Sequence, residues 1–142
     1  MVETKTSAKQ ITICSDISKI QSVRQAILAE MSDAGFDEES KMAVAVALDE
    51  CLTNAIKHGN KNNRKLTVDI NYKIAAGRVE ISITDQGRGF NWRANKHLSG
   101  SEEFTGYEIG GRGLFMINNM MTSVDYNDAG NQVTIVKANS AE

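Results

Sequence analysis

The 142-residue sequence contains no proline and only two cysteines, Cys14 and Cys51. Because proline is absent, no turn or helix end in the chain depends on a proline stop. The cysteines have neither metal-ligand spacing nor a partner cluster of histidines, so a zinc site that adds His58 and His97 is disfavoured. Two isolated thiols favour a reducing compartment over a disulfide-bonded scaffold.

Long hydrophobic runs are also absent. The apolar run at residues 43–48, even with Met42 before it, is far shorter than the ~20 residues that cross a bilayer. The N-terminal stretch MVETKTSAKQ lacks the apolar segment of a signal peptide. A formal net charge of −2 indicates neither a nucleic-acid footprint nor a basic patch for an anionic membrane. We therefore expect a soluble, cytoplasmic protein without direct contact to nucleic acid or membrane.

The residues that are present are typical of one globular domain. Hydrophobic residues make up 41% of the chain and charged residues 24%, which is the ordinary range for a protein with a packed core. The length corresponds to one domain, since domains typically span ~100–200 residues. We expect the polar residues 1–9 to form a disordered tail and residues 10–142 to form a single domain.

The first part of the chain predicts a strand and two helices. Residues 11–14 are typical of a short strand. Apolar side chains then recur at helical spacing over residues 17–34. Asp37 is a suitable first cap for a second helix, whose body covers residues 40–57.

The remaining regular structure is predicted as two hairpins. Apolar and polar residues alternate at residues 66–74 and 79–83, and two further strands are expected at residues 123–126 and 132–138. The turn residues Ala76-Gly77 and the segment 127–130 connect the strands of each pair.

Between the hairpins lie a long glycine-rich loop, residues 86–112, and a helix predicted over residues 112–121. Long loops in compact domains are usually functional or disordered. Hairpins with helices grouped between them predict an α/β (α+β) two-layer sandwich. Its sheet is expected to be mixed and mostly antiparallel, with the helices on one face.

The second helix carries a polar row. On a helical wheel, Glu50, Asn54 and Lys57 fall within about 60° of one another. The opposite side is expected to be apolar and consists of Val44, Ala45, Leu48, Leu52, Ala55 and Ile56. A solvated polar face explains such a row, although small apolar residues at 43, 46 and 47 share that face. The helix is expected to end at Gly59 in the left-handed conformation.

The same row also suits phosphoryl transfer. An amide oxygen is a hard ligand for Mg²⁺, and a lysine ammonium neutralises phosphate. A carboxylate can orient or deprotonate a nucleophile. The spacing alone leaves both interpretations open.

Asp85 begins a second motif, TDQGRGF, directly after a predicted strand. Gly87 and Gly89 would allow a flat ring to approach the backbone closely. A carboxylate that accepts from an exocyclic amine favours adenine over guanine, whose equivalent position is a carbonyl oxygen. An ordinary turn is the alternative, because Asp and Gly are common turn residues.

A third motif, GGRGL at residues 110–114, precedes a predicted helix. Glycines at a helix N-terminus leave N–H groups free, which suits phosphate. The motif lacks the ending of a P-loop, and no G-x-G-x-x-G pattern fits it. A flexible hinge is the alternative interpretation.

Taken in this order, the three motifs resemble the ATP-binding domain of gyrase, heat-shock chaperones, histidine kinases and mismatch-repair ATPases, known as the Bergerat fold. Within this superfamily the sequence is most similar to the small bacterial anti-sigma factor serine kinases. Residues 50–59 match the family pattern E-x-x-T-N-A-x-x-H-G. The resemblance covers residues 11–137.

The resemblance implies a role for each polar residue of the second helix. Asn54 would coordinate the Mg²⁺ that bridges the ATP phosphates. Glu50 would be the catalytic base that activates the attacking hydroxyl. Lys57 and His58 would face the phosphates.

The glycine motifs also receive roles from the resemblance. Asp85 would accept a hydrogen bond from the adenine amine, and Gly87 and Gly89 would shape that end of the pocket. Residues 91–109 would form a lid, whose aromatic residues pack or bind a partner. The phosphates of ATP or ADP would be held by Gly111, Arg112, Gly113 and Leu114.

The sequence departs from the superfamily after Gly130. A threonine or serine is common there, whereas this chain has Asn131 and Gln132. The last adenine-side contact is therefore not assigned by the resemblance.

The resemblance implies an ATP-dependent protein serine/threonine kinase that is also an anti-sigma factor in transcription regulation. It would transfer the ATP γ-phosphate to a small anti-sigma-factor antagonist and sequester a sigma factor or similar target. Possible homodimers follow from the same likeness. The alternative is a non-catalytic ATP/ADP-binding partner-switching module. A histidine-kinase catalytic domain is disfavoured, since His58 and His97 lie in the asparagine motif and the lid.

Overall fold

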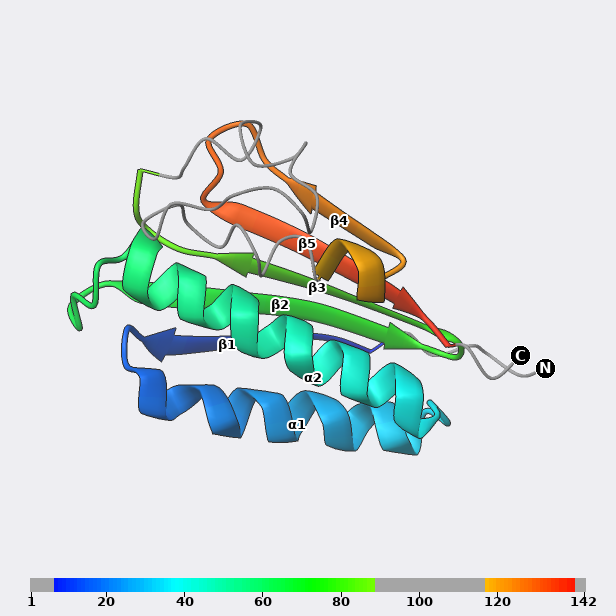
Figure 1. The fold of residues 1–142 in the computed structure, drawn as a ribbon. Helices are drawn as coiled ribbons and strands as arrows, with labels where there is room; N and C mark the ends of the chain where they lie inside the picture. Colours follow the sequence, from blue (N-terminus) through cyan, green and yellow to red (C-terminus); the bar gives the residue numbers. More distant parts are fainter. Residues whose placement is uncertain (1–6, 89–116, 140–142) are drawn as a thin grey trace.

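The computed structural model describes residues 7–88 and 117–139 (Figure 1). Its sheet has the order β1-β2-β3-β5-β4, and each neighbouring pair of strands is antiparallel. The strands are β1 (Ser7–Cys14), β2 (Thr67–Ala75), β3 (Arg78–Thr84), β4 (Ser123–Tyr126) and β5 (Gln132–Ala138).

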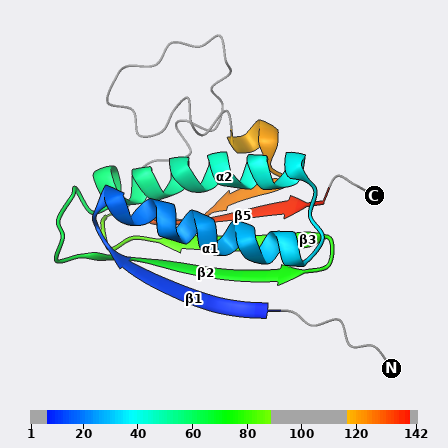
Figure 2. The ribbon, with the colours of Figure 1, turned by 90° about the horizontal axis from the view of Figure 1, so that it is seen from below.

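The helices α1 (Ile20–Asp33) and α2 (Glu38–Thr53) lie on one face of this sheet. A short helical stretch at residues 117–120 lies on the same face as α2 (Figure 2). The predicted two-layer architecture is confirmed. Among the residues described, no parallel strand pair occurs.

The core lies between the two layers and follows the period-two pattern of the strands. In β2 the buried residues Val68, Ile70, Tyr72 and Ile74 alternate with more exposed ones. The helices contribute fully buried aliphatic side chains from their facing sides, such as Ile27 of α1. Each such side chain contributes ~1.5–3 kcal/mol through burial. The opposite face of the sheet stays polar, as one-sided antiparallel sheets allow.

Strand β1 begins earlier than expected. Residues 7–9, assigned to a disordered tail, pair with β2, from Ser7 opposite Ile74 to Lys9 opposite Tyr72. The Lys9 Nζ also lies 3.1 Å from the Glu30 carboxylate of α1. The tail prediction is therefore wrong for residues 7–9, because polar side chains on a sheet edge do not prevent backbone pairing.

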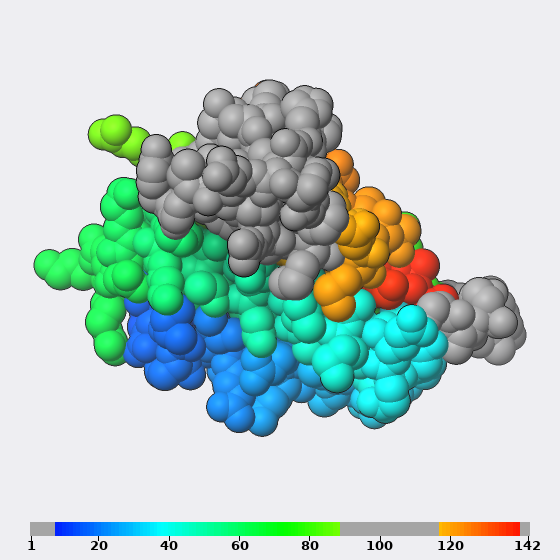
Figure 3. Space-filling model, in the orientation of Figure 1, coloured from blue at the N-terminus to red at the C-terminus, as the bar shows by residue number. Residues whose placement is uncertain are grey.

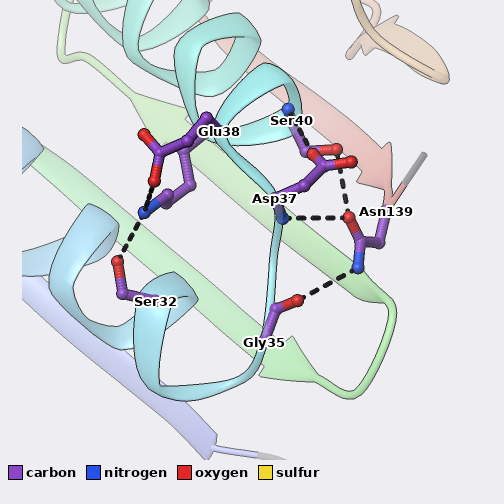
Figure 4. Close-up of polar contacts among 7 residues, drawn as sticks. Ser32, Gly35, Asp37, Glu38, Ser40 and Asn139 are labelled. Carbon is purple, nitrogen blue, oxygen red and sulfur yellow. Dashed lines mark hydrogen bonds and ion pairs between the residues drawn. The ribbon is translucent and has the colours of Figure 1, made fainter. Parts of the chain in front are cut away.

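Asn139, the residue after β5, is bound to the connection between the helices (Figure 4). Asp37 caps α2 as predicted, since its carboxylate accepts from the Ser40 N–H at 2.7 Å. The Asn139 side-chain oxygen accepts from the Asp37 N–H at 3.2 Å, and its amide group donates to the Gly35 carbonyl at 3.3 Å. These bonds link the end of β5 to both helices.

Helix α2 does not end as predicted. Its last turn, Asn54–Gly59, is π-helical, and the Asn60 N–H donates to the Ala55 carbonyl at 2.8 Å. Gly59 is not left-handed; instead Lys61 (φ 54°) and Asn62 (φ 60°) reverse the chain. A wider turn shifts every side chain after Asn54 around the helix axis, so a regular wheel misplaces them.

The buried side of α2 is also wider than the wheel predicts. Ala43 and Ala47, expected on the polar face, are buried. They are buried because α2 packs against β5 as well as against α1. Only small side chains fit at such a double contact, which explains why the polar row is interrupted by alanine.

The two hairpin predictions are confirmed by the described residues. Gly77 takes a φ of 81° in the β2–β3 turn, and Gly130 a φ of 83° in the β4–β5 turn. In the second turn the Asn127 side-chain oxygen accepts from the Gly130 N–H at 2.8 Å. Within residues 7–88 and 117–139, no helix has the length and apolar character needed to span a membrane.

Candidate functional site

A pocket that is partly open to solvent lies where the end of α2 approaches the end of β3 and the beginning of β5. The residues that line it come from three parts of the chain and are Cys51, Asn54, Ala55, His58, Gly59, Ile83, Asp85, Tyr126, Gly130, Asn131, Gln132 and Val133. The pocket therefore joins the asparagine motif to the first glycine motif.

Asp85 is the buried acid of this pocket, with 9% of its surface exposed. One carboxylate oxygen accepts from the Gly87 N–H at 2.7 Å. The Asp85 backbone N–H donates to the Asn131 carbonyl at 2.9 Å, which fixes the residue at the end of β3. Among the described residues, the bond from the Gly87 N–H is the one hydrogen bond that the Asp85 carboxylate accepts. A ligand that offers an N–H donor, such as an exocyclic amine, would satisfy its second oxygen.

Two glycines allow the Asp85 carboxylate to sit where it does. A Cβ atom on Gly59 would collide with the Asp85 carboxylate, and one on Gly87 would collide with the carbonyl oxygen of Gly59. The end of α2 and the chain after β3 thus touch through backbone atoms. The sequence predicts Gly59 as the helix stop, and no spacing rule indicates its contact with Asp85.

Substituting Gly59 by alanine is expected to destabilise the protein by ~1–3 kcal/mol, the usual cost of overpacking. The added methyl must displace Asp85, so nucleotide affinity should fall as well. Chemical denaturation and a nucleotide titration measure the two effects. Gly77→Ala is the control, because its Cβ would meet nothing within 4 Å. Its left-handed backbone should cost stability alone, and equal loss of affinity in both variants would contradict the role of Gly59.

Asn60 holds the frame of the pocket together and was not identified from the sequence. It is 1% exposed, and its amide group donates to the Ser15 hydroxyl at 2.9 Å and to the Thr67 carbonyl at 3.0 Å. Its side-chain oxygen accepts from the Gln86 N–H at 2.8 Å. One asparagine therefore connects the end of α2 to β1, β2 and the residue after Asp85. The role of Asn60 depends on partners that are distant in the sequence, so only the folded structure shows it.

The polar row of α2 is divided by the π-helical turn. Asn54 and His58 line the pocket, whereas Lys57 is exposed and does not. Glu50 is half-buried and lies one helical turn before Asn54 without lining the pocket. The structure brings Asn54, His58 and Asp85 together, and it does not place Lys57 with them.

The remaining sequence predictions for the site fall outside the described residues. These are Gly89, the lid at residues 91–109, and the phosphate-binding residues Gly111, Arg112, Gly113 and Leu114.

The floor of the pocket is apolar and was not predicted. Cys51, Ile83 and Val133 line it, together with Tyr126. Burial raises the pKa of the Cys51 thiol to about 12, so the thiol stays protonated at neutral pH and acts as an apolar surface. An apolar floor with one carboxylate at its edge suits a flat heterocycle that carries an amine.

The pocket carries a testable pH dependence. Burial raises the pKa of the Asp85 carboxyl, and the Gly87 hydrogen bond only partly opposes this. The folded protein therefore binds the Asp85 proton more tightly than the unfolded chain does. Ionisation of Asp85 lowers the free energy of unfolding as the pH rises through the folded pKa. Asp85→Asn should be more stable than wild type near neutral pH, and the difference should shrink as pH falls toward 3.8. Thermal unfolding between pH 4 and 8 measures it; a difference independent of pH would contradict the assignment.

The chain is similar to proteins of one family. Residues 13–137 match the family model described as a histidine kinase-like ATPase domain. The serine-protein kinase RsbW of Staphylococcus epidermidis is 35% identical over 106 residues, which are 70% of this chain and 64% of that protein. RsbW of Listeria innocua is 32% identical over 111 residues, 75% of this chain and 71% of that protein. The chain thus spans less than two thirds of the length of the staphylococcal relative.

A solved structure shares the fold. The RsbU and RsbW domains of Rv1364c from Mycobacterium tuberculosis match with a TM-score of 0.61 at 22% identity, over 92% of this chain and 31% of that chain. The family model covers most of the sequence, including the asparagine motif and Asp85. The chain belongs to the histidine kinase-like ATPase superfamily, in its family of anti-sigma factor serine-protein kinases.

Proposed function

We propose that the pocket binds the adenine of ATP or ADP. The observation that carries this proposal is the buried Asp85 carboxylate, which Gly59 and Gly87 admit to the pocket and which has one protein N–H donor among the described residues. The carboxylate would accept from the adenine amine above the apolar floor. Guanine offers a carbonyl oxygen at that position and would place two acceptors together.

The residues toward the solvent end would bind the phosphates and Mg²⁺. Asn54 lines the pocket and offers an amide oxygen, a ligand type that Mg²⁺ accepts together with phosphate oxygens. His58 lines the same wall. Gly89 and residues 111–114 stay predictions for the remaining contacts.

We propose that the chain is a protein serine/threonine kinase. When bound, Mg-ATP supplies the γ-phosphoryl group. Glu50 would accept the proton of the attacking serine or threonine hydroxyl. Its half-buried carboxylate lies four residues before Asn54, so both side chains project from one face of α2. This spacing supports the proposal that Glu50 is a base beside the proposed metal ligand.

The family suggests the partners of this reaction. We propose that the phosphate acceptor is a small anti-sigma-factor antagonist, and that the chain sequesters a sigma factor or a similar target in the cytoplasm. The alternative function is a nucleotide-binding module without catalysis. One observation favours it: Glu50 does not line the pocket, whereas the binding residues Asn54 and Asp85 do.

An affinity capture from native cytosol tests the function. The chain is incubated with cytosol and Mg-ATP or Mg-ADP, and captured proteins are scored for new phosphoserine and phosphothreonine by mass spectrometry. The kinase proposal predicts one small protein that is phosphorylated only with ATP and only by a chain with intact Glu50. Capture that depends on nucleotide but never adds phosphate would favour the binding module.

A further inference from the structure

One end of the molecule concentrates positive charge. Between Glu50 and Asp69 the sequence contains no acidic residue, and it contains Lys57, Lys61, Arg64 and Lys65. The formal net charge of −2 hides this segregation, because acidic residues elsewhere balance it.

The fold adds a further cation to these four. The Gln86 N–H donates to Asn60, and the Gln86 side chain accepts from the Thr67 N–H. The chain leaving β3 therefore crosses the loop after α2 and brings the exposed Arg88 to the same end. We call the exposed residues Lys57, Lys61, Arg64, Lys65 and Arg88 the basic end. The loop (green) projects beside the beginning of α1 (blue) at the left of Figure 3.

Most of these cations have no carboxylate partner in the part of the chain that the structure describes. Arg64 pairs with Asp16 at 3.0 Å, and its side chain is still 70% exposed. Across residues 7–88 and 117–139, none of the other four forms an ion pair with a carboxylate. Asp85 is nearby in sequence to Arg88 but is buried in the pocket. The basic end thus presents a net positive field to solvent.

The loop after α2 contains two residues in an unfavourable backbone conformation. Lys61 and Asn62 are both left-handed, a conformation that glycine adopts more cheaply than lysine. Hydrogen bonds fix it: the Asn62 N–H donates to the Ile56 carbonyl at 2.8 Å, and the Leu66 N–H donates to the Asn63 carbonyl at 2.9 Å. A lysine in a strained backbone conformation that hydrogen bonds hold in place indicates a function more strongly than a lysine in an ordinary solvated loop does.

An exposed apolar residue accompanies the charges. Ile17 is 41% exposed and follows Asp16, the partner of Arg64. In the described part of the chain, Ile17 and Met42 are the two large hydrophobic residues that are largely exposed. An exposed apolar side chain beside charged residues is a common feature of protein-binding surfaces.

We propose that the basic end is a docking surface for an acidic segment of a partner protein, with Ile17 as its apolar contact. The surface adjoins the pocket, since His58 and Gly59 line the pocket and Lys57 and Lys61 flank them. A partner held there would lie next to the bound nucleotide. Docking does not require phosphoryl transfer, so it can hold even where the proposed kinase activity fails.

The test uses a fluorescein-labelled twelve-residue peptide of alternating glutamate and glycine with one central leucine. Its anisotropy is followed without nucleotide, at low salt and at 0.15 M salt. The proposal predicts that Lys61→Glu/Lys65→Glu raises the Kd about tenfold or more. The matched control, Lys73→Glu/Arg78→Glu, makes the same charge change at the far end of β2 and β3 and should change the Kd less than about twofold. Equal losses in the two variants would overturn the proposal.

Two further experiments serve as controls. The first separates an effect on binding from an effect on folding, and the second compares an acidic protein segment with other polyanions. Lys61→Gly removes one cation and relieves the left-handed backbone, so it should weaken peptide binding without lowering the unfolding temperature. The same peptide with glutamine in place of glutamate should not bind. Tighter binding of a single-stranded oligonucleotide or of anionic phosphatidylserine vesicles than of the acidic peptide would overturn the assignment to a protein partner.

Discussion

Replacing Glu50 by glutamine is expected to slow phosphoryl transfer by about 100- to 10,000-fold, the usual contribution of a general base. The amide cannot take the hydroxyl proton, although it keeps the shape of the side chain. Glu50 does not line the nucleotide pocket, so the Kd for Mg-ATP should stay within about twofold of wild type. A single-turnover assay with γ-labelled ATP and the phosphate acceptor measures the rate, and a nucleotide titration measures the Kd.

The control for Glu50 lies on the same helix. Glu38 is at the start of α2, its side chain is 92% exposed, and it pairs with Lys41 at 2.8 Å. Glu38→Gln should leave both rate and affinity near wild type, because exposed ion pairs contribute little. If Glu50→Gln transfers phosphate as fast as Glu38→Gln, then Glu50 is not the base.

Replacing Asp85 by alanine is expected to raise the Kd for Mg-ATP by about 10- to 100-fold. A hydrogen bond to a charged group is worth ~1.5–3 kcal/mol, which corresponds to this range. The variant also loses the acceptor for the Gly87 N–H, so the close contact of Gly59 and Gly87 should loosen. Isothermal titration calorimetry with Mg-ATP measures the change directly.

Asp125 provides the matched control for Asp85. It is exposed on β4 and is not among the residues that line the pocket. Asp125→Ala removes the same charge from the protein and should bind Mg-ATP like wild type. An equal loss of affinity in both variants would mean that overall charge, and not the adenine contact, explains the result.

The sequence predicted the sheet and the helices well because their signals are local. Alternation in β2 and β3, the turn at Gly77 and the cap at Asp37 each depend on residues a few positions apart. The acid at the end of β3 was also found, since its neighbours in the chain are glycines. Such features can be read without knowing the tertiary structure.

The parts that were missed depend on contacts between distant segments. Gly59 is required because Asp85 packs against its Cα, and Asn60 is required because four chain segments meet around it. The π-helical turn removed Lys57 from the polar row, and a wheel with a fixed angle cannot show that. The basic end also depends on a contact between distant segments, because the chain after β3 brings Arg88 close to the loop after α2.

The most direct test of the nucleotide site is a comparison of Mg-ATP and Mg-GTP binding to the wild-type chain by isothermal titration calorimetry. The two nucleotides carry the same phosphates and ribose, so a difference in Kd reports on the base alone. If the Asp85 carboxylate receives the adenine amine, Mg-ATP should bind at least about tenfold more tightly than Mg-GTP. Equal affinities, or no binding of Mg-ATP, would contradict the assignment of this pocket.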